Sequence, residues 1–476
     1  MNPDLHPGGP LDTHQKAFQI NLDAHRYGTI AEIGAGQEVA RAFFHVGGAA
    51  GTVAKTISAY DMTFSDAIYG PCERYVSRQR LQTMLDYEFA LLLERLNQQR
   101  GSGSLFFVFA DTVAARSYSR QHDAHGWMGI KFQTEPMGSP SQIILHVRMW
   151  DKENVQQQEA VGALGVNLIH GAFYLHQAPN QLISSLLDNL SPERIEVDLV
   201  KFSGPAFREV DNRLMSLQLL HHQLGNTALF MPGGEVAQPG EVLYNKPILV
   251  ERGSFRPVNL LHLDMLRGAR EKFAGEAGVE GQEVEILMEI TMRNLVSPSS
   301  GTIDHQDFLA RVDLLGALGL NVMISNYSRF YRMAAYLAGL TRQRIGFAVG
   351  TPTLKEIFDA RYYGDLEGGI LESFGRLFKN AVRLYIHPCR ETTGPLVTVK
   401  NLEVAPNLRH LYAFLLENRH LEFIDHYDES LLPIRSRELL ERIQSGKPGW
   451  ETMVPPIVAG LIKERGYFGS ALQPAS

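Results

Sequence analysis

Residues 29–61 read TIAEIGAGQEVARAFFHVGGAAGTVAKTISAYD, and this stretch decides the fold. A short β-prone run ends at the Gly-Ala-Gly turn of residues 34–36. Residues compatible with a helix follow, and a second glycine cluster leads into another β-prone run. Strand, glycine turn, helix, strand and terminal acid form the layout of a nucleotide-binding βαβ unit. In such a unit Gly34 and Gly36 let the backbone approach a phosphate or sugar, and Asp61 binds the ribose hydroxyls.

Three departures from the full dinucleotide fingerprint leave a second interpretation open. Val39 stands where a third glycine is expected, and Glu32 lies in a strand that a parallel sheet would bury. The distance from Gly34 to Asp61 also exceeds the usual ~20 residues. The alternative is a structural turn without a ligand, because glycine is the default residue of tight turns. We retain both interpretations, and we include Lys55, in the second β-prone run, among the candidate cofactor-binding residues.

The composition is that of a globular protein with more than one domain. The chain has 476 residues, of which 44% are hydrophobic and 20% are charged, so we expect two or three domains. The formal net charge of −7, with no basic stripe, argues against nucleic-acid binding. Cys72 and Cys389 give neither a disulfide framework nor the spacing of a zinc site. We therefore predict no metal centre, although a magnesium ion that accompanies a nucleotide is compatible with the sequence.

The sequence shows no targeting or membrane segment. No apolar run approaches the roughly 18 residues of a membrane span. The first residues, MNPDLHPGGPLD, contain no basic region followed by an apolar one. We expect a cytoplasmic protein without a membrane partner, and the sequence leaves a homo-oligomer open.

The alternation of patterns predicts an α/β fold. Residues 105–110 are typical of a fully buried strand, and residues 127–133 and 142–150 are typical of an antiparallel hairpin. After residue 192, strand-like and helix-like segments alternate as they do in a parallel sheet covered by helices. We predict a Rossmann-like fold of mostly parallel sheets, with an inserted antiparallel hairpin and a helical C-terminus. The expected parts are a flexible tail (1–14), an N-terminal α/β domain with the glycine-rich turn (15–190), a second α/β domain (191–405) and a helical C-terminal segment (406–476).

Polar residues that directly follow predicted strands are candidate site residues, because ligands bind beyond the carboxyl ends of the strands in an open parallel sheet. They include Asp111, which we predict to be catalytic, and Asn326, which we predict to bind a cofactor. The alternative is conformational, since turns after strands need polar residues in any case. At Asn326, ordinary helix capping and phosphate binding would use the same geometry.

Two charged groups in the middle of the chain carry more specific chemistry. Arg252 and Arg256 flank Gly253, and guanidinium groups bind phosphate or carboxylate bidentately, so we predict a ligand's anionic group there. Ion pairs in an exposed loop are the alternative. Glu289 lies in an apolar run, where an unpaired carboxylate would cost roughly several kcal/mol. We predict Glu289 as a catalytic acid or base beside a catalytic Arg293, and a structural ion pair between these two residues is the alternative.

Five runs of sequence resemble a family of bacterial proteins of similar length, over nearly the whole chain. Members are often labelled nicotinate-nucleotide adenylyltransferase and sometimes TonB-dependent receptor. The first label implies adenylyl transfer to nicotinate mononucleotide through an H-x-G-H and an S-x-T-x-x-R motif. The sequence contains neither motif, so no catalytic residue carries over; the second label would require a signal peptide. The runs are AEIGAGQEVARAFFHVGGAAGTVAKTISAYDMTFSDAIYG, IEVDLVKFSGP, VERGSFRPV, LMEITMRNL and GGILESFGRLF.

The leading hypothesis is a transferase that acts on a nucleotide or another phosphorylated small molecule. It requires the glycine turn and the arginine and glutamate groups to open onto one cleft, and it leaves the cofactor unknown among ATP, NAD and S-adenosylmethionine. A second hypothesis is an S-adenosylmethionine-dependent methyltransferase or an NAD-dependent oxidoreductase, because the glycine turn and Asp61 are similar to motifs of both classes. The third is a non-catalytic assembly or regulatory protein, which the absence of every strong catalytic motif favours.

Overall fold

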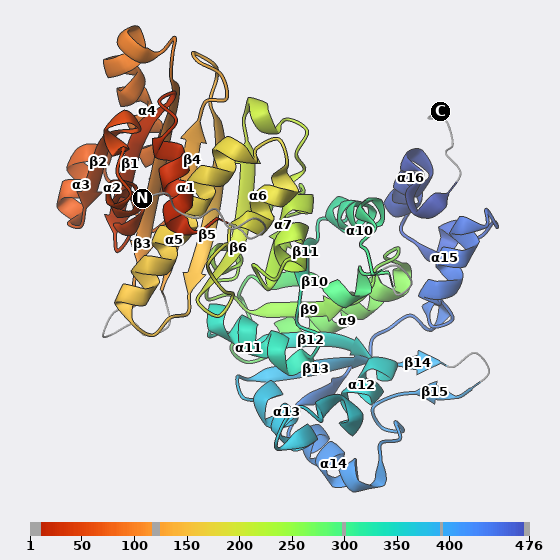
Figure 1. The fold of residues 1–476 in the computed structure, drawn as a ribbon. Coiled ribbons are helices and arrows are strands. Elements are labelled where there is room, and N and C mark those ends of the chain that lie inside the picture. Colours follow the sequence, from red (N-terminus) through yellow and green to blue (C-terminus); the bar gives the residue numbers. More distant parts are fainter. Residues whose placement is uncertain (1–10, 117–123, 298–300, 391–393, 471–476) are drawn as a thin grey trace. The chain divides into compact units, whose positions relative to one another are not determined.

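The chain forms two compact units in the computed structural model (Figure 1). The structure describes residues 11–116, 124–297, 301–390 and 394–470, so most of the predicted flexible tail, residues 1–14, lies outside the described residues. The N-terminal unit is Met1–Asn226 and the C-terminal unit is Thr227–Ser476. Helix α1 (Thr13–Asn21) begins within the predicted tail, because Asp12 and Gln15 form a capping box at its start.

The N-terminal unit is built on a six-stranded mixed sheet. The strand order is β2-β1-β3-β4-β5-β6, with the first three strands parallel and the others antiparallel. The predicted hairpin is confirmed as β4 and β5. The strands are β1 (Arg26–Gly34), β2 (Val53–Ala59), β3 (Leu105–Ala114), β4 (His125–Phe132), β5 (Ser141–Met149) and β6 (Ile195–Ser203).

Helices cover both faces of this sheet. Leu81 and Leu85 of α4 lie against Gly129 on one face. On the other face Gly165 of α5 lies against Phe109 and against Val39 of α2. The small residues of α5 therefore allow this close packing. The helices are α2 (Glu38–His45), α3 (Met62–Tyr69), α4 (Arg78–Arg100), α5 (Asn154–Tyr174), α6 (Pro179–Ser185) and α7 (Asn212–His221).

The C-terminal unit contains an eight-stranded sheet in the order β16-β13-β12-β9-β10-β11-β7-β8. Six of its strands are parallel, and β7 and β8 form an antiparallel edge. The chain builds outward from β9 in one direction and from β12 in the other, so the switch in strand order falls between these neighbours. The strands are β7 (Thr227–Phe230), β8 (Val236–Ala237), β9 (Ile248–Arg252), β10 (Glu285–Thr291), β11 (Asn321–Ser325), β12 (Ile345–Gly350), β13 (Val382–His387) and β16 (Leu421–Phe423), and β14 (Cys389–Arg390) pairs separately with β15 (Leu396–Val397).

The strands β9, β12 and β13 are mostly apolar and mostly buried, as strands of a covered parallel sheet should be. Leu287, Phe347 and Leu384 belong to one cluster of buried side chains that also includes residues of α11 and α13. The predicted Rossmann-like α/β fold is therefore confirmed. The helices are α8 (Pro239–Val242), α9 (Leu260–Ala274), α10 (His305–Ala317), α11 (Phe330–Leu340), α12 (Thr351–Ile357), α13 (Gly369–Leu377), α14 (Arg409–Glu417), α15 (Ser436–Gln444) and α16 (Pro456–Arg465).

The structure differs from the sequence prediction at two strands, β6 and β16. Strand β6 was expected to open a second domain at residue 191, but it pairs with β5, and the division between the units falls after Asn226. Strand β16, within the predicted helical segment, extends the parallel sheet beside β13. Strand partners depend on contacts between distant residues, which a local pattern does not contain. Of the helices in the described part of the chain, none has the length and hydropathy that crossing a membrane requires.

Candidate functional site

A pocket of about 520 Å³ lies in the C-terminal unit, beyond the carboxyl ends of its parallel strands. Segments that follow β9, β10, β11 and β12 line it, and β9 and β12 are the neighbours at the switch in strand order. This is where open α/β sheets bind ligands, and the volume is within the roughly 300–1,000 Å³ of small-molecule sites. The lining residues are Arg252, Gly253, Ser254, Thr291, Arg293, Asn294, Ser328, Arg329, Phe330, Thr353, Glu356, Ile357, Tyr362 and Tyr363.

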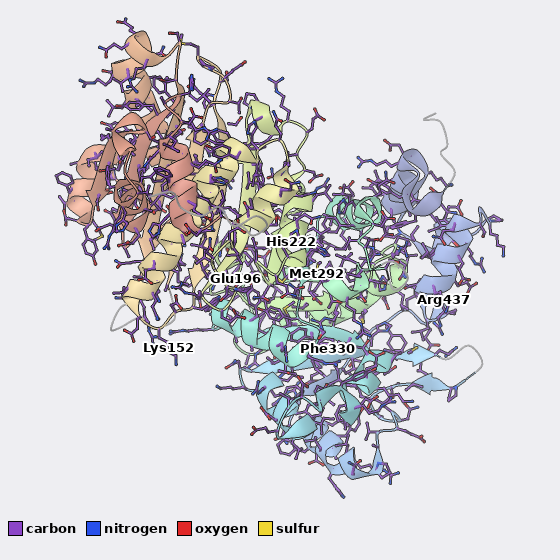
Figure 2. All side chains as sticks on the ribbon, in the orientation of Figure 1. Lys152, Glu196, His222, Met292, Phe330 and Arg437 are labelled. Atoms are coloured by element: carbon purple, nitrogen blue, oxygen red, sulfur yellow. The ribbon has the colours of Figure 1, made fainter. Side chains whose placement is uncertain are left out.

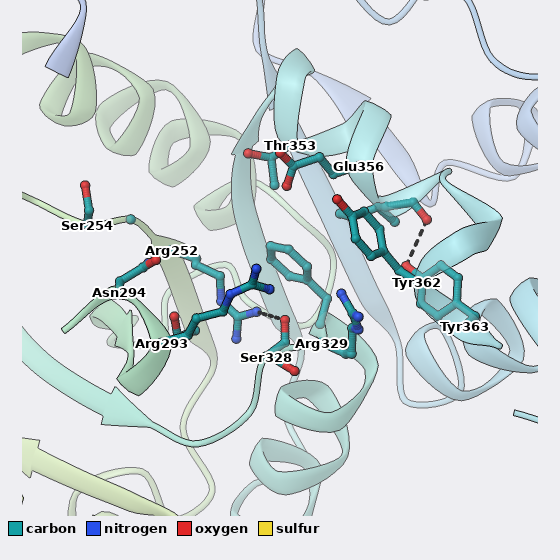
Figure 3. A pocket seen from close by; sticks show the side chains of 14 residues that line it. Arg252, Ser254, Arg293, Asn294, Ser328, Arg329, Thr353, Glu356, Tyr362 and Tyr363 are labelled. Carbon is teal, nitrogen blue, oxygen red and sulfur yellow. Dashed lines mark hydrogen bonds between the residues drawn. The ribbon is translucent and has the colours of Figure 1, made fainter. Parts of the chain in front are cut away.

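Three arginines give the pocket its charge. Figure 3 shows the side chains of Arg252, Arg293 and Arg329 gathered on one side, with Thr353 and Glu356 across from them. Phe330, which is labelled in Figure 2, is the first residue of α11 and also lines the pocket. Arg252 is paired with the buried Glu289, and the other two arginines against one carboxylate leave the lining with an excess of positive charge, which favours an anionic ligand.

Arg293 and Arg329 are the two arginines whose guanidinium groups are available to a ligand. Arg293 is exposed and Arg329 is half-buried. Within the described residues, neither guanidinium group makes an ion pair or a hydrogen bond. Arg329 lies over the ring of Tyr362, with 4.6 Å from its guanidinium carbon to the ring centre. These two side chains can therefore donate hydrogen bonds to a phosphate without first breaking an ion pair or a hydrogen bond within the described residues.

The start of α11 adds a second source of positive potential. Its N-cap residue is Arg329, whose own side chain makes no capping hydrogen bond. The first backbone N–H groups of a helix have no partner within the helix, and together they carry about half a positive charge. Because Ser328, Arg329 and Phe330 line the pocket, this end of the helix lies at the ligand site.

Arg252 differs from the other two arginines because the protein already holds it. Its Nε donates to the carboxylate of Glu289, and its terminal nitrogens donate to the carbonyl oxygens of Tyr327 at 2.9 Å and Ser328 at 3.2 Å. Its guanidinium carbon lies 4.5 Å from the centre of the Phe330 ring. Arg252 therefore fastens β9 to the loop before α11 while also lining the pocket.

Glu289 lies beneath the pocket rather than in its lining. Its side chain is fully buried, and it accepts hydrogen bonds from Arg252 and from the hydroxyl of Ser325. Burial raises the pKa of Glu289, and the two donors oppose that shift. The ion pair that Glu289 makes is with Arg252, its register partner on β9, and not with Arg293, which was the structural alternative considered from sequence.

Arg256 and Asn326, the remaining sequence-predicted residues of this unit, lie outside the pocket lining. Arg256 forms an ion pair with Asp307, which also pairs with the buried Arg311. A carboxylate shared by two arginines compensates the buried charge of Arg311. Asn326 is exposed in the loop between β11 and α11.

In the N-terminal unit, the two glycines of the glycine turn lie against β3. Gly34 has φ +80°, and a Cβ atom there would be 2.3 Å from the carbonyl oxygen of Val113. At Gly36 a Cβ atom would be 2.4 Å from a carboxylate oxygen of Asp111. Contacts this short require glycine at both positions whether or not a ligand binds.

Two buried carboxyl groups lie at the carboxyl ends of β1 and β3. Glu32 accepts hydrogen bonds from the backbone N–H groups of Val39 and Ala40, at 2.9 and 3.0 Å. Burial raises the pKa of Glu32 to about 7 despite these bonds. The pKa of Asp111 is raised well above its ordinary value, first by complete burial and then by the nearby Glu32. The polar residue in the first β-prone run is therefore a cap for α2, which explains its presence in a buried strand.

Asp61 and Lys55 both have partners in the N-terminal unit. Asp61 is exposed and caps α3, with its carboxylate accepting from the N–H of Phe64 at 2.9 Å. Lys55 forms an ion pair with the buried Glu88, which also accepts from the hydroxyl of Tyr69. The ten sequence-predicted residues are thus divided equally between the two units, and of them Arg252 and Arg293 line the pocket. That the glycine turn shares a cleft with the arginines stays a prediction.

The described residues contain no group of three His, Cys, Asp or Glu side chains that could hold a metal ion. A magnesium ion carried by a nucleotide would need oxygen ligands, and Glu356 is the carboxylate in the pocket lining. It would hold such an ion together with the ligand's own phosphates.

Thr353 is one of the polar residues that follow a predicted strand, but Arg329, Glu356 and Tyr362 also line the pocket and were not selected as site residues from the sequence. Arg329 ends the Ser-Asn-Tyr-Ser-Arg segment after a predicted strand, so the rule that pointed to Asn326 could have found it. Glu356 and Tyr362 follow β12 by several residues, and the sequence contains no local signal for them.

The chain matches no protein-family model and no curated protein sequence. Solved structures that resemble parts of it include a competence/damage inducible protein, CihA, from Agrobacterium tumefaciens, with 17% identity and a TM-score of 0.23 over 34% of this chain and 93% of that one. A competence-damaged protein (CinA) superfamily protein from Enterobacter cloacae has 15% identity and a TM-score of 0.26, over 36% of this chain and 98% of the other.

A third structure is described as a "Putative Nicotinate-nucleotide Adenylyltransferase" from Vibrio parahaemolyticus. It shares 12% identity with a TM-score of 0.22, over 48% of this chain and 98% of that one. Its name is the one that the sequence resemblance implied. At these TM-scores the likenesses support no inference about what this chain binds.

Proposed function

We propose that the C-terminal unit binds a nucleotide or another phosphorylated small molecule in the pocket beyond β9, β10, β11 and β12. The observation that carries this proposal is that Arg293 and Arg329 line the pocket while neither guanidinium group makes an ion pair or a hydrogen bond within the described residues. Arginine forks match the geometry of phosphate oxygens, and the start of α11 adds backbone N–H donors. Phe330 and Tyr362 supply apolar surface for the organic part of the ligand.

The reaction that we propose for this site is group transfer, which the family resemblance implies. Its support in the pocket is the positive lining, because arginines that clamp a phosphoryl or adenylyl group stabilise the charge that develops during transfer. In the pocket lining Glu356 is the carboxylate that could move a proton.

A second candidate is a non-catalytic protein that binds the same class of ligand. It is favoured by the composition of the lining, in which the described residues include no His, Cys, Lys or Asp. An assay for product formation with ATP and a phosphorylated acceptor separates the two candidates, because both predict binding and only the transferase predicts turnover.

Binding is tested with Arg293→Ala and Arg329→Ala, titrated with ATP and with inorganic pyrophosphate by calorimetry. A hydrogen bond to a charged group contributes about 1.5–3 kcal/mol, so each change should raise the Kd by roughly 10-fold or more. Arg361→Ala is the matched control, because Arg361 is next to Tyr362 in the chain but 87% exposed and paired with Asp359. The proposal fails if wild-type protein binds neither probe, or if Arg361→Ala weakens binding as much as the other two changes.

A further inference from the structure

Glu289, Arg252 and Ser325 form a buried cluster that three neighbouring strands share, and we name it the Glu289 cluster. Glu289 lies on β10, Arg252 at the end of β9 and Ser325 at the end of β11. The carboxylate of Glu289 accepts from the Nε of Arg252 and from the hydroxyl of Ser325. Glu289 and Ser325 are fully buried, and the side chain of Arg252 is 10% exposed.

The Glu289 cluster holds the loop before α11 by its backbone. Arg252 donates to the carbonyl oxygens of Tyr327 and Ser328. The hydroxyl oxygen of Ser325 accepts from the N–H of Tyr327 at 3.2 Å. Two consecutive residues of the loop are thus fixed at three backbone atoms, and the next two residues are Arg329 and Phe330.

The orientation of Arg252 depends on Glu289. With its Nε directed at the buried carboxylate, the planar guanidinium group directs its other donors to the loop and lies over Phe330. Without that carboxylate, Arg252 would keep its charge but lose the acceptor that fixes its plane. The loop would then lose two of its three attachments.

We propose that Glu289 is a positioning residue, which fixes the ligand-binding Arg329 by way of Arg252 and the loop before α11. Glu289 lines no part of the pocket, so it acts on the ligand through other residues. The statement that Arg329 binds the ligand rests on the proposed function, whereas the statement that Glu289 holds the loop before α11 does not.

The first test measures hydrogen exchange of the full-length protein without ligand. Glu289→Gln should speed the exchange of the amides of residues 327–329 by about 10-fold or more, because the loop loses attachments to the cluster. Glu285→Gln is the matched control. Glu285 is also a buried glutamate on β10, but its partners are Lys246 and Asn321 at the other end of the strand. Equal exchange in the two variants would overturn the inference, whether or not a ligand binds.

The second test is a double-mutant cycle on the binding of inorganic pyrophosphate. If Glu289 acts through Arg329, Glu289→Gln weakens binding about 10-fold in the wild-type background and changes it less than about 2-fold when Arg329 is alanine. A merely structural role would give the same fold-change in both backgrounds, and that result would overturn the inference. If the wild type binds no pyrophosphate, the proposed function fails, and hydrogen exchange still decides the role of Glu289.

A milder variant keeps the test usable if Glu289→Gln does not fold. Ser325→Ala removes the hydroxyl that connects Glu289 to the N–H of Tyr327, and it leaves the ion pair with Arg252 in place. It should speed exchange at Tyr327 more than at Arg329. No change at Tyr327 would contradict the arrangement described here.

Discussion

At the scale of single residues, the sequence predicts which side chains are unusual better than it predicts their partners. Glu289 is recognisable as an acid in an apolar run, and burial and pairing follow from that. Its partner is Arg252 because β9 lies beside β10 in a register that opposes these two residues. Arg293 is nearer in sequence, but it lies beyond the strand in a short 3₁₀ helix. The register between strands is set by the whole sheet, so no local pattern contains it.

Gly36 and Asp111 show how a glycine motif can have a purely steric cause. Gly36→Ala should lower the free energy of unfolding by about 1–3 kcal/mol, because the added methyl group would overlap the buried carboxylate. Chemical denaturation measures this change. Gly51→Ala is the control within the same stretch, since a Cβ atom there meets nothing within 4 Å.

The same contact gives a sharper comparison. In an Asp111→Ala background the methyl group at residue 36 has no carboxylate to meet, so Gly36→Ala should then cost much less. An unchanged cost in that background would show that the requirement for glycine comes from the backbone alone.

At the scale of elements, hydrophobic patterns predicted individual strands well. The buried run at 105–110 lies in β3, and the runs at 127–133 and 142–150 correspond to β4 and β5. The sheet to which each strand belongs was harder to predict. The sequence pattern of β6 is similar to that of the strands after it, but β6 pairs with β5. An acid near a predicted helix start can also have two causes. Glu32 and Asp61 cap the starts of α2 and α3, and an acid at such a position would equally be expected in a ligand site.

The cap of α2 makes the stability of the N-terminal unit depend on pH. The pKa of Glu32 is raised from about 4.5 to about 7 in the folded chain, chiefly by burial. A raised pKa means that the folded state favours the protonated form of Glu32. The contribution of this group to the free energy of unfolding is therefore complete below about pH 4.5 and is lost as the pH rises to about 7. The urea midpoint of this unit should therefore be lower at pH 7.5 than at pH 5, to an extent that shrinks in Glu32→Gln.

Tryptophan fluorescence can report this transition selectively. Trp127 and Trp150 belong to the N-terminal unit and Trp450 to the C-terminal unit, so a Trp450→Phe background leaves only reporters of the first. If Glu32→Gln shows the full difference between the two pH values, other groups cause it and the assignment to Glu32 is wrong.

At the scale of the whole molecule, the chain is two α/β units in series. The sequence predicted more than one domain and the class of fold, and both follow from length and alternation. The site could be predicted only as a set of residues at strand ends, because the strands that are neighbours at the switch point are far apart in the chain. Arg252 follows β9 and Thr353 follows β12, and the sheet brings these segments to one pocket.

Every residue that lines the pocket belongs to the C-terminal unit, so this unit should bind by itself. A chain that comprises only residues 227–476 should bind inorganic pyrophosphate with a Kd within about 3-fold of the full-length value, measured by calorimetry. Folding of the shorter chain is checked by circular dichroism. A folded fragment without affinity would show that the first 226 residues contribute to the site.

The pairing of Ile248 with Ile345 also sets when a newly made chain can gain its site. A ribosome releases β9 long before it releases β12, and a parallel pair cannot form until both have emerged. Arg252 is therefore synthesised well before Tyr362 and Tyr363, which complete the lining of the pocket. Ligand capture on a translating ribosome would consequently mark chains in which synthesis has passed Tyr363, and it would be absent from every shorter nascent chain.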